Sequence, residues 1–522
     1  MQLLAEPHGG RRLALLAGAM ILAMLVLLGV AARARATENL YWDNYQDEPV
    51  TIGSSDMTGS GGGLLNLSGL QIEATEGMAY DPVTNRLYIG AEMYKTNEGV
   101  IAYVNLDGSG AGLFSAPGLV ANAPEGIVID PATRMMYWTN DKSNKWSISW
   151  AKLDGSAAGS VNVAGAATED YYRLALDPAS GRLYWRSRTG GGTEQVISWA
   201  SVNNTGGGIL PADVKSLAIH GLATDPLNNR LYIIGGNGSP GTLSSVGLDG
   251  GPVETLSLAT AHSPYGLAID PVAGIAYWGN YGLNKVPTEA IGSVSLAGVA
   301  GGGISPATTP TNGPQDPVIV RSPTGTGAPQ VTQAKAALSC SQGTWAPDYA
   351  GAFLYQAPVS YSYQWFLNGQ PVAGATAASF TATTAGSYTC AVTGKNPTGT
   401  ATQTSTAAAT VAPAKLALTL KTKKVKAKAG KTAIVKLKIA NGGDVASVPL
   451  KVCAKLTKKA KEGLVAPKCA AVKAVGSGRS AVATLKVKTK GTAGGAYKFT
   501  AKVKGKGVSA KGVTVHVKVT GA

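Results

Sequence analysis

A motif built around an Asp-Pro pair recurs five times in the first part of the chain at a nearly constant interval. The pairs begin at Asp81, Asp130, Asp177, Asp225 and Asp270, so the steps are 49, 47, 48 and 45 residues. A period of this length, filled with short strand-like segments, is typical of the blades of a β-propeller. The repeat therefore predicts an all-β ring in which each copy forms one sheet.

Each copy of the motif predicts a hairpin. A short apolar strand ends at the Asp, whose side chain can bond nearby backbone amides, and the Pro fixes φ for a turn. The chain returns as a second strand, in which a Tyr stands seven residues after the Asp. These tyrosines are Tyr88, Tyr137, Tyr184, Tyr232 and Tyr277. Large flat side chains at one register suit packing between neighbouring sheets. A third strand then ends in a tight turn, often Asp-Gly, which is a strong hairpin signal.

A sixth unit is split between the two ends of this region. Leu40–Asn44 and Ile52–Asp56 match a second and a third strand, but no Asp-Pro strand precedes them. Asp316–Arg321 echoes Glu125–Asp130 and is predicted to supply the missing inner strand. Closing the ring in this way removes two exposed sheet edges. The sequence thus predicts a six-bladed propeller over residues 37–325, and a chain that ends near Thr326 is expected to keep its cooperative unfolding.

The Tyr-Trp strands, preceded by Gly-Leu-Ala-Ile-Asp or close variants, resemble the YWTD repeats of the low-density lipoprotein receptor class. The resemblance covers roughly Asn39 to Pro323 and implies a six-bladed propeller with a face that binds protein ligands. The Asp that closes the family motif is replaced here by Asn140, Asn280, Ser187 or Gly235. No cysteine-rich module follows, which argues against receptor-type ligands.

Residues 326–413 predict a second domain. Cys340, Trp365 and Cys390 follow one another at intervals of 25 residues, and Tyr388 stands two residues before the second Cys. This spacing resembles an immunoglobulin-like sandwich, in which the Trp packs on the intersheet disulfide and the Tyr makes the corner. The segment is also similar to small immunoglobulin-like modules of bacterial surface proteins, and we expect it to act as a spacer.

Residues 414–522 predict a third, Lys-rich domain. Apolar residues alternate with Lys in Lys436–Ile439, Leu485–Lys488 and Val513–Lys518, and a period of two indicates half-buried strands. The segment resembles the adhesion-type sandwiches of bacterial exoproteins.

The four cysteines, Cys340, Cys390, Cys453 and Cys469, all follow the propeller. An even number in an exported chain predicts disulfides. Of the three connectivities, we favour the pairs within each segment. No CxxC spacing occurs, so zinc binding is not expected.

Charge is divided unevenly along the chain. Residues 37–330 carry 14 basic and 26 acidic side chains, a net charge of −12, whereas residues 413–522 carry 26 basic and 2 acidic side chains, a net charge of +24. Lysines on strand faces also keep sheet edges from pairing. A charge this large should attract polyanions, such as an anionic cell-wall polymer or phospholipid. Aromatic residues are nearly absent there, which argues against nucleic acid.

The N-terminus predicts export. Arg11 and Arg12 precede an apolar run, Leu13–Val30, and Ala34-Arg35-Ala36 fits a small-residue cleavage site. Residues 1–36 therefore fit a secretory signal peptide. The run is longer than a typical signal core, so an uncleaved membrane anchor is the alternative. We expect a secreted or cell-surface protein of bacterial type.

One position of the repeat, five residues before the Asp, places comparable side chains at the start of each inner strand. These residues are Glu76, Glu125, Tyr172, His220 and Tyr265, with Asp316 as the sixth. Equivalent positions of a propeller surround one mouth of its central channel. We predict a binding face there for a protein or glycan ligand. The alternative is that they are ordinary solvated loop residues.

A calcium-dependent hydrolase or lactonase is the alternative function. Six-bladed propellers of the gluconolactonase type hold a catalytic calcium in the channel, and Glu76, Glu125 and Asp316 could supply the oxygen ligands that calcium prefers. Nothing else resembles that family beyond the blade count and the Glu-Gly pairs. No Ser-His or Cys-His constellation is recognisable, so no catalytic residue and no further cofactor are predicted.

Overall fold

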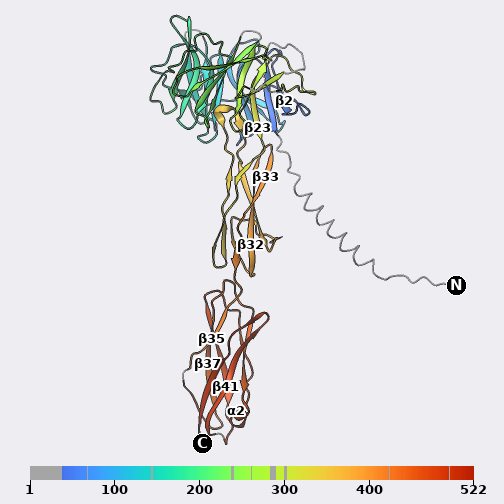
Figure 1. Ribbon diagram of the computed structural model, residues 1–522, viewed down its shortest axis with the longest axis vertical. Coiled ribbons are helices and arrows are strands. Elements are labelled where there is room, and N and C mark those ends of the chain that lie inside the picture. The colour runs from blue at the N-terminus through green and yellow to red at the C-terminus, as the bar shows by residue number, and fades with distance from the viewer. Residues whose placement is uncertain are drawn as a thin grey trace, which may run out of the picture. The chain divides into compact units, whose positions relative to one another are not determined.

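The computed structural model describes residues 38–521, apart from residues 68, 143–144, 237–239, 260, 282–289, 299–301, 423 and 493. These residues form an almost entirely β structure, as the sequence predicts (Figure 1). They divide into two compact units. The first comprises the residues up to 324, with 346–360 and 395–401; the second comprises 325–345, 361–394 and the residues from 402 onward.

The predicted signal peptide or anchor, residues 1–36, lies outside the described residues. Within the described part of the chain, no helix has the length and apolar character needed to cross a membrane.

The first unit is a propeller-like ring of sheets. In the described residues the ring has six sheets, and each sheet contains one inner strand. The inner strands are β4 (Ile72–Asp81), β8 (Pro124–Asp130), β12 (Glu169–Asp177), β16 (Gly221–Asp225), β20 (Pro264–Asp270) and β23 (Pro314–Arg321). Each inner strand contacts the next, and β23 contacts β4, so the ring is closed.

The outer strands follow in antiparallel order. The second strands are β1 (Glu38–Asn44), β5 (Arg86–Met93), β9 (Met135–Asn140), β13 (Arg182–Thr189), β17 (Arg230–Gly235) and β21 (Ile275–Asn280). The third strands are β2 (Thr51–Asp56), β6 (Gly99–Asn105), β10 (Ser147–Lys152), β14 (Glu194–Ser201), β18 (Gly241–Gly247) and β22 (Ile291–Ser295). The fourth strands are β3 (Gly62–Leu64), β7 (Ala111–Leu113), β11 (Ala158–Ser160), β15 (Gly207–Ile209) and β19 (Glu254–Leu258).

The ring closes through the split sheet. Strand β1 pairs with β2 on one side and with β23 on the other, with Tyr41 opposite Val318. This pairing confirms the prediction that Asp316–Arg321 supplies the missing inner strand.

The second strands are held in register by large aromatic side chains packed opposite small ones. Four fully buried tryptophans each pair with a Gly or Ser on the third strand. The pairs are Trp42 with Gly53, Trp138 with Ser149, Trp185 with Ser198 and Trp278 with Gly292. A Cβ on Gly292 would overlap the indole of Trp278, so this position accommodates no side chain.

Asn residues close the motif where the resembling repeats have Asp. Asn280 is fully buried, and its Oδ1 accepts hydrogen bonds from the Trp278 indole at 2.9 Å and from the backbone amide of His262 at 3.0 Å. Asn140 likewise accepts from the amide of Asn122, while its Nδ2 donates to Ser149. The amide therefore stabilises the loop before the inner strand without burying a charge.

A segment from beyond the ring completes the first unit. The 3-10 turn η1 (Ala350–Ala352) contacts inner strands β8, β12, β16 and β20, and β28 (Leu354–Tyr355) pairs in parallel with β23. The amide of Ile319 donates to the carbonyl of Phe353 at 2.9 Å. Residues 346–360 were predicted to belong to the second domain, but they form part of the first unit.

The second unit begins with a disulfide-bonded segment. Its strands are β24 (Gly325–Gly327), β25 (Val331–Ala334), β26 (Ala337–Cys340), β27 (Thr344–Trp345), β29 (Ser360–Leu367), β30 (Gln370–Pro371), β31 (Ser379–Thr381), β32 (Gly386–Asn396), β33 (Gly399–Thr404) and β34 (Ala409–Val411). Cys340 is bonded to Cys390 as predicted, and Trp365 is fully buried in the same core. The Tyr388 hydroxyl donates to the carbonyl of Thr384 at 2.8 Å.

The Lys-rich segment forms two sheets around one core. One sheet holds β35 (Leu416–Leu420), β37 (Thr432–Asn441) and β40 (Ser480–Lys488). The other holds β36 (Val425–Lys428), β38 (Leu450–Leu456), β39 (Ala470–Val472), β41 (Gly495–Gly505), β42 (Val508–Ser509) and β43 (Val513–Thr520). The short helix α2 (Lys458–Gly463) is capped by Thr457, and the predicted disulfide between Cys453 and Cys469 is present.

Candidate binding site at the mouth of the propeller

The inner strands approach one another closely at the position four residues before the repeat's Asp. This position is occupied by Gly77, Gly126, Gly221 and Gly266, with Pro317 in the sixth strand. A Cβ on Gly126 would lie 2.5 Å from the backbone nitrogen of Leu174, and one on Gly77 would lie 2.8 Å from that of Ile127. The ring of small residues therefore forms where neighbouring backbones leave no room for side chains.

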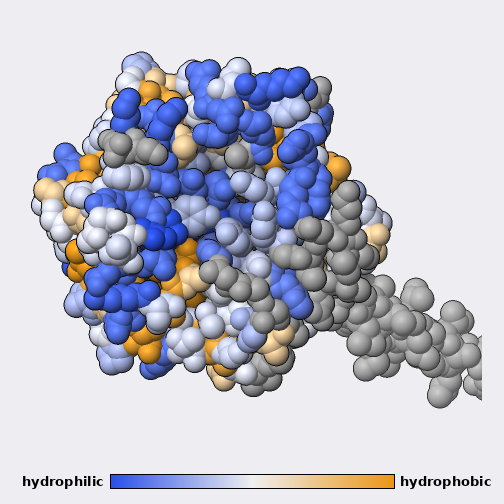
Figure 2. Space-filling model, turned by 90° about the horizontal axis from the view of Figure 1, so that it is seen from above, coloured by the Kyte–Doolittle hydropathy of each residue, from blue (hydrophilic) through white to orange (hydrophobic). Residues whose placement is uncertain are grey.

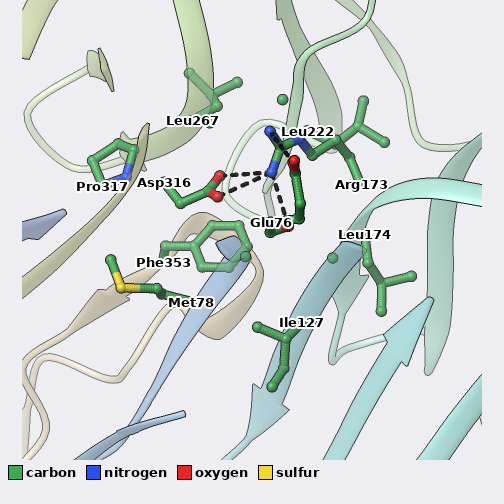
Figure 3. Close-up of a pocket in the computed structure, with 14 residues that line it drawn as sticks. Glu76, Met78, Ile127, Arg173, Leu174, Leu222, Leu267, Asp316, Pro317 and Phe353 are labelled. Atoms are coloured by element: carbon green, nitrogen blue, oxygen red, sulfur yellow. Dashed lines mark hydrogen bonds and ion pairs between the residues drawn. The ribbon is translucent and has the colours of Figure 1, made fainter. Parts of the chain in front are cut away.

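Arg173 is the exception in this ring. Its backbone has a positive φ of 51°, and the residue is 3% exposed. Figure 3 shows its guanidinium directed between two carboxylates: Nη1 lies 3.0 Å from Oδ2 of Asp316, and Nη2 lies 3.2 Å from Oε2 of Glu76. It also donates to the side-chain oxygen of Gln315 at 3.0 Å. Arg173 was not among the predicted site residues, although a large cation at a position that otherwise holds Gly or Pro is visible in the sequence.

Aromatic side chains surround this ion cluster. The Tyr172 hydroxyl donates to Oε2 of Glu76 at 3.2 Å. The Arg173 guanidinium lies 4.7 Å from the ring centroid of Tyr172 and 5.4 Å from that of Tyr265. A second guanidinium, that of Arg186, lies 4.3 Å from the Tyr172 ring. Cation–π contacts of this kind are strongest where the cation is desolvated.

Four rings continue outward from the cluster as an aromatic arc, defined by His220, Tyr265, Tyr281 and Tyr45. His220 stacks on Tyr265 with centroids 4.2 Å apart, Tyr265 lies 5.1 Å from Tyr281, and Tyr281 lies 5.9 Å from Tyr45. Burial, with the nearby guanidinium groups, lowers the pKa of His220 to about 4, so the imidazole is neutral at physiological pH. The arc is half-buried and thus offers ring surface toward solvent.

Two further carboxyl groups lie near the cluster. Glu125 Oε2 and Asp43 Oδ1 are buried and have no hydrogen-bond partner among the described residues. Burial raises the pKa of Glu125 well above its ordinary value, and the neighbouring Glu76 adds to the shift. Burial also raises the pKa of Glu76 to about 7, although Arg173 opposes the change. The centre of the mouth is therefore rich in carboxyl groups.

The structure brings the six predicted residues to one end of the ring. Glu76, Tyr172 and Asp316 belong to the Arg173 cluster, while His220 and Tyr265 belong to the aromatic arc. Glu125 lies within electrostatic reach of Glu76 and Arg173. None of the six is a fully solvated loop residue, since all are at least half-buried. Figure 2 shows this face of the molecule, with hydrophilic residues around its centre. Their role in binding stays a prediction.

The opposite side of the Arg173 cluster is closed. A cavity of about 20 Å³ lies beneath it, which is room for about one water molecule. Apolar side chains of the inner strands and of the inserted segment line this cavity: Met78, Ile127, Leu174, Leu222, Leu267 and Phe353 (Figure 3). Phe353 is 8% exposed and lines this cavity from the inserted segment. A ligand at the mouth would therefore meet a closed floor.

The carboxylates that could hold calcium do not fit that ion. Glu76 and Asp316 both direct oxygens at the Arg173 guanidinium, so a fixed cation already occupies the space between them. Among the described residues, no group of three His, Cys, Asp or Glu side chains is placed to hold a metal ion. The Arg173 guanidinium therefore takes the place that a calcium ion would need between these carboxylates.

Similarity to known proteins is found among solved structures, whereas the sequence comparisons found no match. The sequence matches no family model and no curated protein. Solved structures that resemble it include a nidogen/laminin complex, with 18% identity and a TM-score of 0.40 over 54% of this chain and 98% of the other. TolB from Acinetobacter baumannii gives 14% identity and a TM-score of 0.40 over 61% and 74% of the two chains. XC5397, a gluconolactonase from Xanthomonas campestris, gives 14% identity and 0.35 over 54% and 86%.

Proposed function

We propose that the first unit is a six-bladed, YWTD-like propeller that binds a polypeptide ligand at its mouth. The observation that carries this proposal is the convergence of Glu76, Tyr172, Asp316 and the aromatic arc around one buried arginine, above a floor closed by Phe353. Half-buried aromatic surface beside a few fixed polar groups is the usual composition of a recognition site. A glycan would use the same rings and is the alternative ligand.

The second unit would hold two immunoglobulin-like sandwiches. The buried Trp365 beside the Cys340–Cys390 bridge and the bond from Tyr388 to the Thr384 carbonyl support this assignment for the first of them. We assign it the role of a spacer. The two disulfides support export, because such bonds persist in oxidising compartments.

The Lys-rich sandwich would attach the protein to an anionic surface. Exposed lysines cover the outer face of the sheet β36-β43-β41-β38, which we call the basic face. They are Lys426, Lys428, Lys451, Lys455, Lys498, Lys502, Lys504 and Lys518. Lys451 lies directly opposite Lys504, and Lys426 pairs with Lys518. Like charges in such positions destabilise a sheet, so this arrangement is unfavourable unless an anion compensates it.

The calcium-dependent lactonase is not supported by a specific observation. Arg173 pairs with two of the three carboxylates that would be needed as ligands. We therefore propose binding alone.

A peptide-display library panned against the protein tests the recognition role. Peptides that bind the mouth should lose binding to the variant Tyr265→Ser, which removes the central ring of the aromatic arc. They should keep binding to Val272→Ala, a control that alters a side chain 67% exposed in the turn after an inner strand. Failure to enrich any peptide, or equal loss with both variants, would contradict the proposal.

A further inference from the structure

The mouth holds more carboxyl groups than cations. Asp43, Glu76, Glu125 and Asp316 all interact electrostatically with Arg173. Among the described residues, Arg173 is the only guanidinium that forms an ion pair with any of them. Its ion pairs are with Glu76 and Asp316. The carboxyl groups of Glu125 and Asp43 therefore have no cation paired with them among the described residues.

The other arginines at this face are already engaged. Arg186 donates to Oδ1 of Asp170 at 2.5 Å, and Arg188 contacts the other oxygen of the same carboxylate. Arg188 also donates to the carbonyl of Gly192 at 2.8 Å. Both guanidinium groups are thus held at Asp170, and among the described residues neither forms an ion pair with Glu125.

Glu125 is the group best placed to receive an external cation. Its Oε2 is buried and lacks a hydrogen-bond partner among the described residues, while the residue as a whole is mostly buried and keeps partial exposure at the mouth. A buried acceptor that has no donor loses free energy relative to its hydrated state. A charged donor from a ligand would supply the missing hydrogen bond. Such a charge-assisted hydrogen bond is stronger than one between neutral groups.

The aromatic arc lies beside this carboxyl group. Tyr45, at one end of the arc, interacts electrostatically with both Glu76 and Glu125. Its ring contacts Tyr281, which in turn contacts Tyr265. Aromatic faces carry negative potential and attract cations, and they also pack well on the alkyl stem of a long basic side chain. A carboxyl group that has no paired cation, beside aromatic faces, therefore favours the binding of an organic cation.

We propose that the mouth binds a basic side chain, lysine or arginine, of a partner polypeptide, with Glu125 as its hydrogen-bond acceptor and the rings of Tyr45, Tyr281 and Tyr265 around its stem. The inference rests on the proposed function and deepens it by naming the chemistry of the ligand. The net charge of −12 over residues 37–330 favours the approach of a basic segment and disfavours nucleic acid or anionic lipid at this face.

Binding of three short peptides to the full protein tests the proposal. The peptides are blocked at both ends and differ at one central position, which carries lysine, arginine or N-acetyl-lysine. We expect the lysine and arginine peptides to bind at least about tenfold more tightly than the acetylated one, measured by ligand-observed NMR. Such a ratio corresponds to about 1.4 kcal/mol. Equal binding of the acetylated peptide would overturn the proposal.

Two variants separate this site from general electrostatic attraction. Glu125→Gln keeps the shape of the side chain and should weaken the lysine peptide about tenfold. Glu98→Gln removes the same charge from an exposed loop between β5 and β6 and should leave the affinity within about twofold, because exposed charges are screened. Equal effects of the two variants would overturn the site.

Tyr281→Ala provides a second test if Glu125→Gln does not fold, since it removes a half-buried ring of the arc. It should weaken the lysine peptide severalfold, and an unchanged affinity would contradict the proposal. Failure of this inference is distinguishable from failure of the proposed function. Peptides from the display library that lack basic residues, yet lose binding with Tyr265→Ser, would overturn the inference and leave the recognition role standing.

Discussion

The guanidinium of Arg173 and the carboxylate of Asp316 join inner strands that are 143 residues apart in the chain, with Nη1 at 3.0 and 3.1 Å from the two carboxylate oxygens. Arg173 belongs to β12 and Asp316 to β23, the strand that closes the ring. The ion pair therefore links the middle of the repeat to its closing sheet through the channel. Because both side chains are buried, removal of one partner leaves the other without compensation.

Arg173→Met should destabilise the protein by roughly 3–5 kcal/mol, because Glu76 and Asp316 would then be buried without a cation. Urea unfolding measures the loss. The double variant Arg173→Met, Asp316→Asn should lose less than the sum of the two single changes, since each already breaks the same pair. Strict additivity, or a loss below about 1 kcal/mol in Arg173→Met, would show that the pair contributes little to stability.

The segment that contains Phe353 changes our expectation for a truncated chain. A chain that ends near Thr326 would lack β28, Phe353 and the T-shaped contact of Tyr355 with Tyr80 at 5.3 Å. It would also expose the parallel edge of β23, which invites pairing with other chains. We now expect such a chain to aggregate or to unfold without cooperativity. Retention of a sharp thermal transition would contradict the role of the segment.

Phe353→Ala tests the same segment in the intact chain. Loss of a buried Phe side chain costs about 3–5 kcal/mol, and the cavity beneath Arg173 would enlarge. Val359→Ala, whose side chain is 45% exposed at the end of the segment, is the control and should cost less than about 1 kcal/mol. Thermal or urea unfolding of the two variants compares them, and similar losses would contradict the packing role of Phe353.

The ring could be predicted from the sequence, because strand pairing within every sheet except the closing one is local and repeated. The spacing of the Asp-Pro pairs and of the tyrosines predicts the positions of the hairpins. The similarity of Asp316–Arg321 to Glu125–Asp130 predicts the closing strand. Phe353 could not be placed in this way. Its contacts join the ring to a segment with no repeat signal, and such contacts depend on tertiary packing alone.

The candidate site was predicted in part. The position five residues before the Asp identified side chains at the mouth because a repeat sets them at equivalent places. The alternative prediction was that these six residues are ordinary solvated loop residues. It did not take account of their burial. Arg173 stands one position further along, where the repeat otherwise has Gly or Pro. Asp43 was missed because it lies on β1, a second strand whose contact with the channel no motif indicates.

Glu76 should make stability depend on pH. Burial raises its pKa from 4.5 to about 7 in the folded protein, with Arg173, Asp316, Tyr172 and Tyr45 facing it. The folded state thus holds a proton that the unfolded state releases between these values. This contribution is fully present below about pH 4.5 and is lost as pH rises through 7.

Glu76→Gln removes that contribution, together with the rise that Glu76 causes in the pKa values of Glu125 and Asp43. The free energy of unfolding of the native protein, taken relative to this variant, should fall by up to about 3 kcal/mol between pH 4.5 and 7.5. His220 acts in the opposite direction, because its pKa is lowered to about 4, but its contribution cancels in the comparison of the two proteins. A relative stability that rises over this interval would show that Glu76 is ionised in the folded state.

The lysines of the basic face should lower the stability of the sandwich and should increase its attraction to anions. Lys451→Gln with Lys504→Gln removes a directly opposed like-charge pair and should stabilise the sandwich by about 0.2–1 kcal/mol. The same change should weaken sedimentation of the protein with phosphatidylglycerol vesicles at low salt. The control Lys335→Gln with Lys395→Gln removes two exposed lysines outside this face and should change neither property appreciably.

Attraction between exposed charges reaches about 10 Å at 0.1 M salt and about 3 Å at 1 M, so vesicle binding should be lost at high salt. Binding that resists 1 M salt, or that is equal on vesicles of neutral phosphatidylcholine, would contradict an electrostatic attachment and would indicate a pocket that recognises an uncharged group.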